Sequence, residues 1–419
     1  MAEPAAARPR RDTAVTAQPQ AGTAVVPRAA TDVAVVGGGP VGIYLAVLLA
    51  QAGISVQVLE QRLTRSEHSR AIGIHPPALE ALAAAGVAGT MSREGVQIRR
   101  GEARSGGSPV AAVDFAAASA RFPYVLTLPQ LRTEALLETR LRALDPDALV
   151  RGVQVAGVHD DAGRVRLRGS FLPGTDGTRA TAGPESQDFS VSARILVAAD
   201  GARSGLRAAL GVPCRTRTLP DTYLMGDFAD QTGDGPVAVL YLESGGIVES
   251  FPLPGGIRRW VAHTDTLEAG ATAADLSRIV ASRTGIRPDP ESNTMLSAFS
   301  VRTGLARKLV HGRTVLIGDA AHEVSPIGGQ GMNLGWLDAA ALAPIISASL
   351  RGNDVGALLA GFGRDRRRAA IVASRQAQLN MALGRPLPGP VLAARNAGLA
   401  RVFRLPAAGH LVARRFTMQ

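Results

Sequence analysis

The sequence is poor in several residue types, and each shortage excludes a class of protein. Its 419 residues include one cysteine, Cys214, which excludes a disulfide framework and a thiolate metal cluster. Aromatic residues make up only 4%, too few for platforms that stack single-stranded nucleic acid. No apolar run approaches the roughly 20 residues of a membrane-spanning helix, and the longest candidate, 43–54, contains Gln51. We therefore expect no nucleic-acid partner and no transmembrane segment.

Lysine is nearly absent, and the charge is unevenly distributed. Of the 46 basic residues one is lysine, Lys308, and the other 45 are arginine. The net charge is +11, and residues 364–419 hold 11 arginines against one acid, Asp365, which leaves +10 there. A nucleic-acid binder would more typically carry its charge through the folded body. The shares of 46% hydrophobic and 19% charged residues are typical of a chain with a sizeable core.

The order of segments predicts an α/β fold with one domain inserted into another. Residues 1–30 lack periodicity and are expected to form a disordered leader. A buried strand at 33–36 begins a nucleotide-binding pattern, and β-like runs at 222–264 interrupt it. We assign 31–100, 124–212 and 301–345 to a Rossmann-like domain, 101–123 and 213–300 to an inserted antiparallel β-sheet domain, and 346–419 to a C-terminal helical segment.

A glycine-rich turn follows the first strand. Gly37, Gly39 and Gly42 form a GxGxxG pattern between that strand and a helix. The first glycine allows a tight turn, the second lets the backbone approach a pyrophosphate, and the third permits close helix–strand packing. Glu60 ends the next strand, 18 residues after Gly42, where an acid binds ribose hydroxyls. This unit predicts a dinucleotide site but does not separate NAD from FAD.

Further motifs separate the two cofactors. Ala199–Arg207 (ADGARSGLR) and Arg313–His322 (RTVLIGDAAH) each follow or end a predicted strand, about 120 residues apart, and Pro326–Asn333 (PIGGQGMN) comes next. Shorter matches lie at Ser69–Gly73 and Leu128–Gln130. This set resembles the group A flavoprotein monooxygenases, typified by para-hydroxybenzoate hydroxylase and the ubiquinone-pathway hydroxylases. The resemblance covers about residues 32–345.

The resemblance implies FAD as the bound cofactor and assigns residues to it. Asp319 is implied to hold the ribityl hydroxyls. Arg70 and Gln130 are implied to reach the pyrophosphate and ribityl region. Asp200 and Gly201 are implied to lie near the pyrophosphate and the groove through which nicotinamide enters.

The segment after the third motif is implied to lie against the flavin ring. Reduced flavin carries negative charge at N1–C2=O, which backbone N–H groups at a helix start stabilise. Gly331, Met332 and Asn333 are placed there, and Pro326 is placed over the N5 edge. His322 is interpreted as a packing histidine rather than a base, so no catalytic side chain is assigned.

The family implies an NAD(P)H-dependent monooxygenase that hydroxylates an aromatic or polyketide-like small molecule with O2, through a flavin C4a-hydroperoxide. One Rossmann unit is visible, so NAD(P)H is expected to bind only transiently. The candidate liners of the substrate pocket, all in the inserted sheet, are Met225, Tyr241, Phe251, Trp260 and His263. We expect a cytoplasmic enzyme of secondary metabolism.

Two other functions stay open: a flavin-dependent reductase of isoprenoid double bonds, and a non-catalytic flavin-binding protein of a biosynthetic pathway. A halogenase is rejected, because that mechanism is usually assigned a lysine early in the chain and Lys308 lies beside the third motif. No metal site is expected, because the sequence contains neither HExxH nor a metal-binding cluster.

Residues 391–405 have the pattern of a basic amphipathic helix. Its apolar positions are Leu392, Leu399, Val402 and Phe403, and its basic positions are Arg395, Arg401 and Arg404. We expect this helix to pack its apolar face on the FAD-binding domain. The alternative is contact with an anionic membrane surface or an acidic carrier protein. The oligomeric state is left open.

Overall fold

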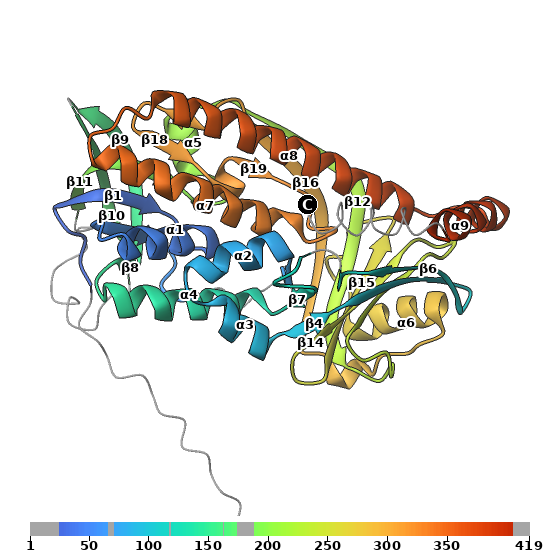
Figure 1. Ribbon diagram of the computed structural model, residues 1–419. Helices are drawn as coiled ribbons and strands as arrows, with labels where there is room; N and C mark the ends of the chain where they lie inside the picture. The colour runs from blue at the N-terminus through green and yellow to red at the C-terminus, as the bar shows by residue number, and fades with distance from the viewer. Residues whose placement is uncertain (1–24, 66–70, 117–118, 162, 174–187, 405–419) are drawn as a thin grey trace, which may run out of the picture.

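The computed structural model describes residues 25–65, 71–116, 119–161, 163–173 and 188–404. Most of the expected leader lies outside these ranges, as do Arg70 and residues 405–419. Figure 1 shows two sheets at opposite ends of an elongated molecule, joined by long helices. The predicted α/β fold is confirmed, whereas the domain boundaries given above stay predictions.

The first sheet carries the nucleotide-binding pattern. In spatial order it consists of β17 (Val310–His311), β18 (Thr314–Leu316), β11 (Asp188–Ala198), β1 (Ala30–Val36), β2 (Val56–Glu60) and β8 (Leu149–Arg151). All neighbours from β18 to β8 pair in parallel. Two antiparallel strands, β9 (Val153–Asp161) and β10 (Arg164–Phe171), extend this sheet from β11. Every residue from Val33 to Val36 is buried, because helices and strands cover both faces.

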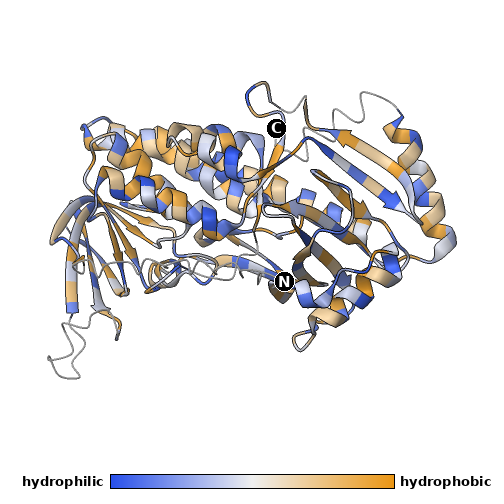
Figure 2. Ribbon diagram, turned by 90° about the horizontal axis from the view of Figure 1, so that it is seen from below, coloured by the Kyte–Doolittle hydropathy of each residue, from blue (hydrophilic) through white to orange (hydrophobic). Residues whose placement is uncertain are grey.

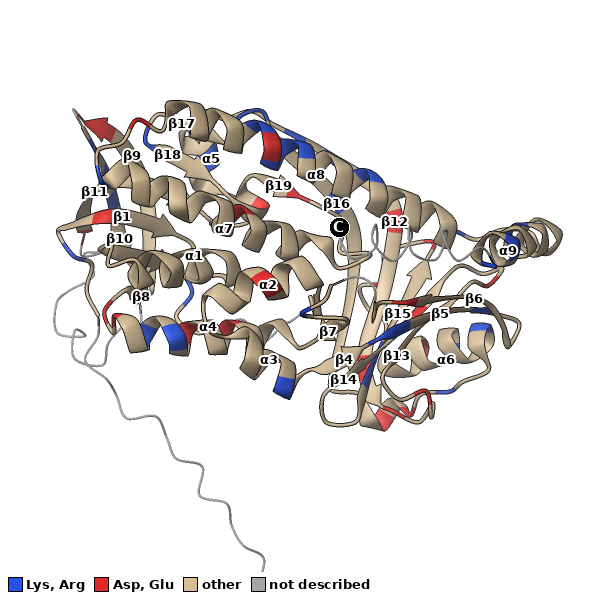
Figure 3. Cartoon of the chain, viewed as in Figure 1, with Lys and Arg blue, Asp and Glu red and all other residues tan. Residues whose placement is uncertain are grey.

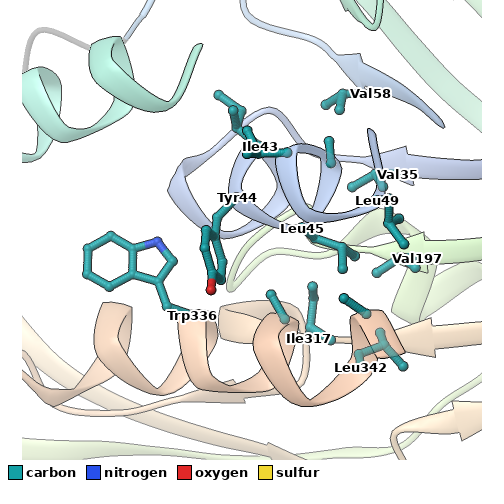
Figure 4. Close-up of a cluster of buried hydrophobic side chains, with 14 of the residues drawn as sticks. Val35, Ile43, Tyr44, Leu45, Leu49, Val58, Val197, Ile317, Trp336 and Leu342 are labelled. Carbon is teal, nitrogen blue, oxygen red and sulfur yellow. The ribbon is translucent and has the colours of Figure 1, made fainter. Parts of the chain in front are cut away.

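Three helices build the core beside this sheet: α1 (Pro40–Gln51), α4 (Gln130–Leu144) and α7 (Gln330–Leu350). Side chains of α1 pack between the parallel strands and α7. Figure 4 shows this for Tyr44 and Leu45 of α1, with Leu342 on the α7 side. The Trp336 indole donates to the carbonyl oxygen of Pro40 at 3.1 Å. The first helix and α7 are therefore fixed to each other where both begin.

The remaining helices surround this core. Their bounds are α2 (Pro76–Ala84), α3 (Ala88–Glu94), α5 (Gly205–Ala209), α6 (Ala273–Thr284), α8 (Gly356–Gly384) and α9 (Gly389–Phe403), with the 3-10 turns η2 (Pro290–Ser292) and η3 (Gly318–Ala320). Helices α2 and α8 pack against α7. Figure 3 shows arginines gathered along α8.

The second sheet is antiparallel except at one pairing. In order it contains β19 (His322–Glu323), β16 (Met295–Ala306), β12 (Cys214–Ala229), β15 (Ile257–Thr264), β14 (Val248–Leu253), β13 (Val237–Tyr241), β5 (Arg100–Ser105) and β6 (Ser108–Asp114). Strands β13 and β5 are parallel. A small sheet of β3 (Gly73–Ile74), β7 (Val125–Thr127) and β4 (Val96–Ile98) lies between the two larger ones in Figure 1.

The two faces of the second sheet have different neighbours, because successive side chains on a strand point to opposite faces. Tyr241 and Trp260 pack with Leu276 and Val280 of α6. The prediction that Tyr241 and Trp260 line the substrate pocket is therefore wrong. Figure 2 shows hydrophobic and hydrophilic residues mixed along the strands of both sheets.

The C-terminal helix α9 packs beside β6 of the second sheet, not on the FAD-binding domain as expected. Leu392 is buried, whereas Val402 is 49% exposed, so the predicted apolar face is not buried as a unit. One arginine of this helix, Arg395, donates to the carbonyl oxygen of Leu383 at the end of α8.

One helix of the described chain, α7, is long and apolar enough to cross a membrane by length and composition alone. This finding concerns length and composition only, so the expected absence of a transmembrane segment stays a prediction. Half of the apolar window is buried inside the protein, where α7 packs against α1, α2 and α8. The helix also carries Asp338, which is fully buried.

Candidate active site

A cavity of about 900 Å³ lies between the two large sheets. On one side it meets the carboxyl ends of β1, β2 and β11, where parallel sheets usually bind ligands. Ten of the predicted cofactor residues line it: Gly37, Gly39, Glu60, Gln130, Asp200, Gly201, Asp319, Pro326, Gly331 and Met332. Gly42 and Asn333 do not line it, and Arg70 lies outside the described residues.

The glycine-rich turn has the geometry that its sequence predicts. Gly37 has a φ of +110°, and a side chain there would collide with the carbonyl group of Ala199. A side chain at Gly42 would collide with the carbonyl oxygen of Gly37, which explains its packing role away from the cavity. Helix α1 then begins at Pro40, with Gly39 as its N-cap and no side-chain cap. The first residues of α1 line the cavity, so its N-terminal backbone faces the cavity, as an anion site requires.

Glu60 holds this turn from the end of β2. One carboxylate oxygen accepts the Gly38 N–H at 2.5 Å, and the other accepts the backbone and Nε of Arg62 at 2.8 and 3.0 Å. The residue is 4% exposed and lines the cavity. Glu60 thus supports the turn and presents a carboxylate to a ribose at the same place.

Gln130 begins α4 on the same side of the cavity. Its backbone N–H donates to the carbonyl oxygen of Ala71 at 3.2 Å, and its amide donates to Glu134 at 2.7 Å. Burial raises the pKa of the Glu134 carboxyl. Since Ala71 follows Arg70 directly, the backbone next to Arg70 lies at the cavity, although Arg70 itself is not described.

The second motif forms a turn that both caps a helix and lines the cavity. One oxygen of Asp200 accepts the Leu206 N–H in α5 at 3.1 Å. The other oxygen is buried, with no hydrogen-bond partner among the described residues. Arg207 donates to the carbonyl oxygens of Ala202 and Ala320, at 2.8 and 2.9 Å. This arginine links the second motif to the third.

Asp319 projects into the cavity from the 3-10 turn after β18. Its side chain is accessible from the cavity, while protein surrounds it on the other sides. The surrounding protein raises the pKa of the Asp319 carboxyl to about 6 by desolvation, and the charge of the nearby His322 opposes this rise. Gly318, with a φ of +59°, makes the turn. A ligand hydroxyl can therefore meet this carboxyl in a setting of few competing protein contacts.

Behind Asp319 lies a buried ionic network. His322 Nε2 lies 2.6 Å from one oxygen of Asp338, and Arg366 Nε lies 2.6 Å from the other. The Gly318 N–H donates to the same carboxylate at 3.0 Å. Although burial opposes both shifts, the ion pair raises the pKa of His322 and, with Arg366, lowers that of Asp338. His322 does not line the cavity, in keeping with its interpretation as a packing histidine.

Two side chains hold the segment before α7: that of His75, which precedes α2, and that of Asn333 in α7. His75 Nε2 lies 3.0 Å from the Gly328 carbonyl oxygen, and burial lowers the His75 pKa to about 4. The Asn333 side chain accepts the His75 N–H at 2.9 Å and donates to the carbonyls of Gly73 and Gly329 at 2.9 and 2.6 Å. The Asn333 side chain thus positions the segment before α7, and a contact of this residue with the cofactor stays a prediction.

Helix α7 also starts without a side-chain cap. Its N-cap is Gly329, with a φ of +67°, and the residues that follow include the cavity liners Gly331 and Met332. Two uncapped helix N-termini, those of α1 and α7, therefore open into one cavity. A ligand with negative charge at two places fits this arrangement, as FAD does with its pyrophosphate and reduced ring.

The second sheet closes the cavity on the opposite side. Met225 and Phe251 line the cavity as predicted. His263 lies on the same face of the second sheet but does not line the cavity, and its Nε2 lies 3.7 Å from a carboxylate oxygen of Asp221. Arg259 lines the cavity and forms a bidentate pair with Asp227, at 2.6 and 2.8 Å. Most of this wall is apolar, which excludes water from a reaction in the cavity.

Sequence reasoning missed several cavity residues. Glu249, His75 and Arg259 belong to no motif, and Leu399 and Phe403 of α9 reach the cavity from the far end of the chain. The β14 sequence, VESFPL, does not alternate polar and apolar residues, so its pattern gave no signal for Glu249. The described residues contain no cluster of His, Cys, Asp or Glu that could hold a metal ion.

Comparisons with known proteins agree with this geometry. The family model described as an FAD binding domain matches residues 30–377. Anhydrotetracycline monooxygenase from Streptomyces rimosus is 30% identical over 371 residues, which is 85% of this chain and 70% of the relative. The 3-(3-hydroxy-phenyl)propionate/3-hydroxycinnamic acid hydroxylase 2 of Burkholderia vietnamiensis is 31% identical over 386 residues, 88% of this chain and 66% of the relative.

Solved structures show the same fold. The p-nitrophenol 4-monooxygenase PnpA from Pseudomonas putida superposes with a TM-score of 0.82 at 25% identity, over 93% of this chain and 99% of that one. OxyS anhydrotetracycline hydroxylase from Streptomyces rimosus superposes with a TM-score of 0.74 at 27% identity, over 93% of this chain and 76% of that one. The extent of the family match and the shared fold bear out the resemblance inferred from the motifs. The chain belongs to the FAD-binding family of group A flavoprotein monooxygenases.

Proposed function

We propose that this protein binds FAD along the first sheet and uses NAD(P)H and O2 to hydroxylate an aromatic or polyketide-like small molecule. The observation that carries the proposal is the pair of uncapped helix N-termini, α1 and α7, that open into a single cavity with an apolar sheet opposite. Anhydrotetracycline and hydroxyphenylpropionate, named for two relatives, are substrates of this general kind.

Some of the described cavity residues would hold FAD, and others would surround the substrate. Gly37, Gly39 and the α1 N-terminus would bind the pyrophosphate, Glu60 the adenosine ribose, and Asp319 the ribityl hydroxyls. FAD, when bound, supplies the electron and oxygen chemistry. The N–H groups at the start of α7 would stabilise negative charge on its ring. Met225 and Phe251 on the sheet would keep water from the substrate.

The test is a turnover assay with oxygen counted. Aromatic compounds are screened for stimulation of NADPH oxidation by the FAD-loaded protein, and the product is weighed. We expect O2 uptake in step with NADPH and a product heavier by one oxygen. A product that gains hydrogen without oxygen would identify a reductase instead, and binding without turnover would identify a non-catalytic flavoprotein.

The basic C-terminal helix is a separate part of the proposal. On α9 the apolar residues Val391 and Val402 are exposed, at 53% and 49%, and Arg401 and Arg404 flank Val402 in the sequence. We keep the contact with an anionic membrane or acidic carrier as a proposal for this face, and a cytoplasmic location with it. Sedimentation with anionic vesicles tests it: pelleting at 0.1 M salt that is lost near 1 M supports a surface contact, and no pelleting at either contradicts it.

A further inference from the structure

The second sheet places one carboxyl in the middle of the apolar wall of the cavity. Glu249 on β14 is 7% exposed and lines the cavity. Its cross-strand partners are Val261 on β15 and Leu240 on β13, and Met225 on β12 lies next to Val261 in the same row. All three line the cavity, so the carboxyl has apolar neighbours on both sides.

No described residue pairs with this carboxyl. None of the side-chain hydrogen bonds or ion pairs among the described residues includes the Glu249 carboxyl, and burial raises its pKa to about 7. The nearest arginine along the cavity face of β15, Arg259, is bound to Asp227 by two hydrogen bonds. The Tyr223 hydroxyl is also buried with no hydrogen-bond partner among the described residues, and the Glu249 charge contributes, after burial, to raising the Tyr223 pKa.

Other charged or titratable groups around this part of the sheet already have partners. Glu102 pairs with Arg100 and Arg104, and Asp221 pairs with Arg385 and lies near His263. The Glu249 carboxyl is largely withdrawn from solvent and opens only to the cavity, so a ligand that donates a hydrogen bond to it stabilises its charge. The carboxyl therefore favours a ligand with a donor and disfavours a ligand with a negative charge.

The position of Glu249 suits a substrate rather than the cofactor. Ile327, which follows Pro326 before α7, packs in one apolar cluster with Met225 and Val261. The Glu249 row thus faces the segment expected at the flavin ring. The adenosine end, by contrast, is marked by Glu60 at the first sheet.

We infer that Glu249 accepts a hydrogen bond from a phenolic or enolic hydroxyl of the substrate, and so selects uncharged hydroxyl-bearing aromatic compounds over aromatic carboxylates. This inference rests on the proposed function, because it places the substrate against the second sheet.

The experiment measures binding rather than turnover. Calorimetry on the FAD-loaded protein at pH 8 compares 1-naphthol with 1-methylnaphthalene and 1-naphthoate, which replace the hydroxyl by a methyl group or a carboxylate. In the unmodified protein 1-naphthol should bind about 10–100-fold more tightly than either, the factor for a hydrogen bond to a charged group.

Two substitutions and a matched control follow. Glu249→Leu should remove the preference for 1-naphthol over 1-methylnaphthalene, and Glu249→Gln should raise 1-naphthoate affinity about tenfold or more, since the amide donates and carries no charge. Glu243→Gln makes the same change outside the cavity, where Glu243 accepts the Gly106 N–H, and should change none of the three affinities.

Affinities for the three compounds within threefold of one another in the unmodified protein, or no binding of 1-naphthol, would overturn the inference. Equal effects of Glu249→Gln and Glu243→Gln would do so as well. If a variant fails to fold, the unmodified protein decides: 1-naphthoate should gain affinity over 1-methylnaphthalene as the pH falls from 8 to 6. Because these are binding measurements, absence of oxygen transfer would refute the proposed function and leave the selectivity result standing.

Discussion

Replacing Asp338 by alanine should destabilise the fold and weaken the FAD site together. Asp338 is fully buried in α7, and its carboxylate joins three separate parts of the chain. It accepts the Gly318 N–H at 3.0 Å and lies 2.6 Å from both His322 Nε2 and Arg366 Nε. Gly318 makes the turn that presents Asp319 to the cavity.

The expected magnitude follows from this burial. Removing one partner of a buried ion pair costs about 3–5 kcal/mol, because the remaining charge is left without compensation. The Arg366 side chain is 16% exposed and can recover some hydration, so we expect about 3 kcal/mol for Asp338→Ala. Asp338→Asn keeps the size and one acceptor oxygen, and should lie between this variant and the unmodified protein.

Urea unfolding of the FAD-free protein measures the stability loss, and titration with FAD measures the affinity. Asp365→Ala is the matched control, since Asp365 is an exposed acid on α8 and its removal should change stability by less than about 0.5 kcal/mol. A loss below 1 kcal/mol for Asp338→Ala, or a loss equal to the control's, would refute the network as a source of stability.

Three further predictions concern single carboxyls. Asp319→Ala should lower bound FAD per chain with little loss of fold, and full occupancy in a folded variant would remove Asp319 from the site. Glu60→Ala should weaken FAD by about 1.5–3 kcal/mol, measured as its dissociation constant, and an unchanged constant would contradict the ribose contact. Burial raises the Glu249 pKa from 4.5 to about 7, so its protonated form favours the folded state; the free energy of unfolding should fall by about 3 kcal/mol between pH 4.5 and 7, at about 1.4 kcal/mol per pH unit. Glu249→Gln should lack this fall, and parallel pH profiles for the two proteins would contradict it.

The parts of the site predicted from sequence are those in which chemistry and geometry are local. Gly42 packs against the backbone of Gly37, five residues before it, and Gly37 packs against the backbone at the end of the neighbouring strand. Their spacing alone therefore specifies the turn. The second and third motifs each follow a strand of one parallel sheet, and parallel strands bring their carboxyl ends to one edge. That is why Asp200 and Asp319, far apart in sequence, line one cavity as expected.

The parts that sequence did not predict depend on distant packing. The Asn333 side chain bonds to Gly73 and His75, about 260 residues away, and nothing in its motif indicates these partners. Trp260 and Tyr241 are large side chains on strands of the second sheet, but which face of that sheet α6 covers is a tertiary property. For the same reason the position of α9 beside β6 could not be read from its own amphipathic pattern.

The central claim is that the cavity between the two sheets performs flavin-dependent oxygen transfer. The most direct measurement is turnover of a stimulating aromatic compound under 18O2 with NADPH, followed by the mass of the product. The account predicts that one oxygen atom of the product carries the heavy isotope, for each NADPH oxidised. A product without the label, or NADPH oxidation that yields only hydrogen peroxide with every compound that binds, would contradict it.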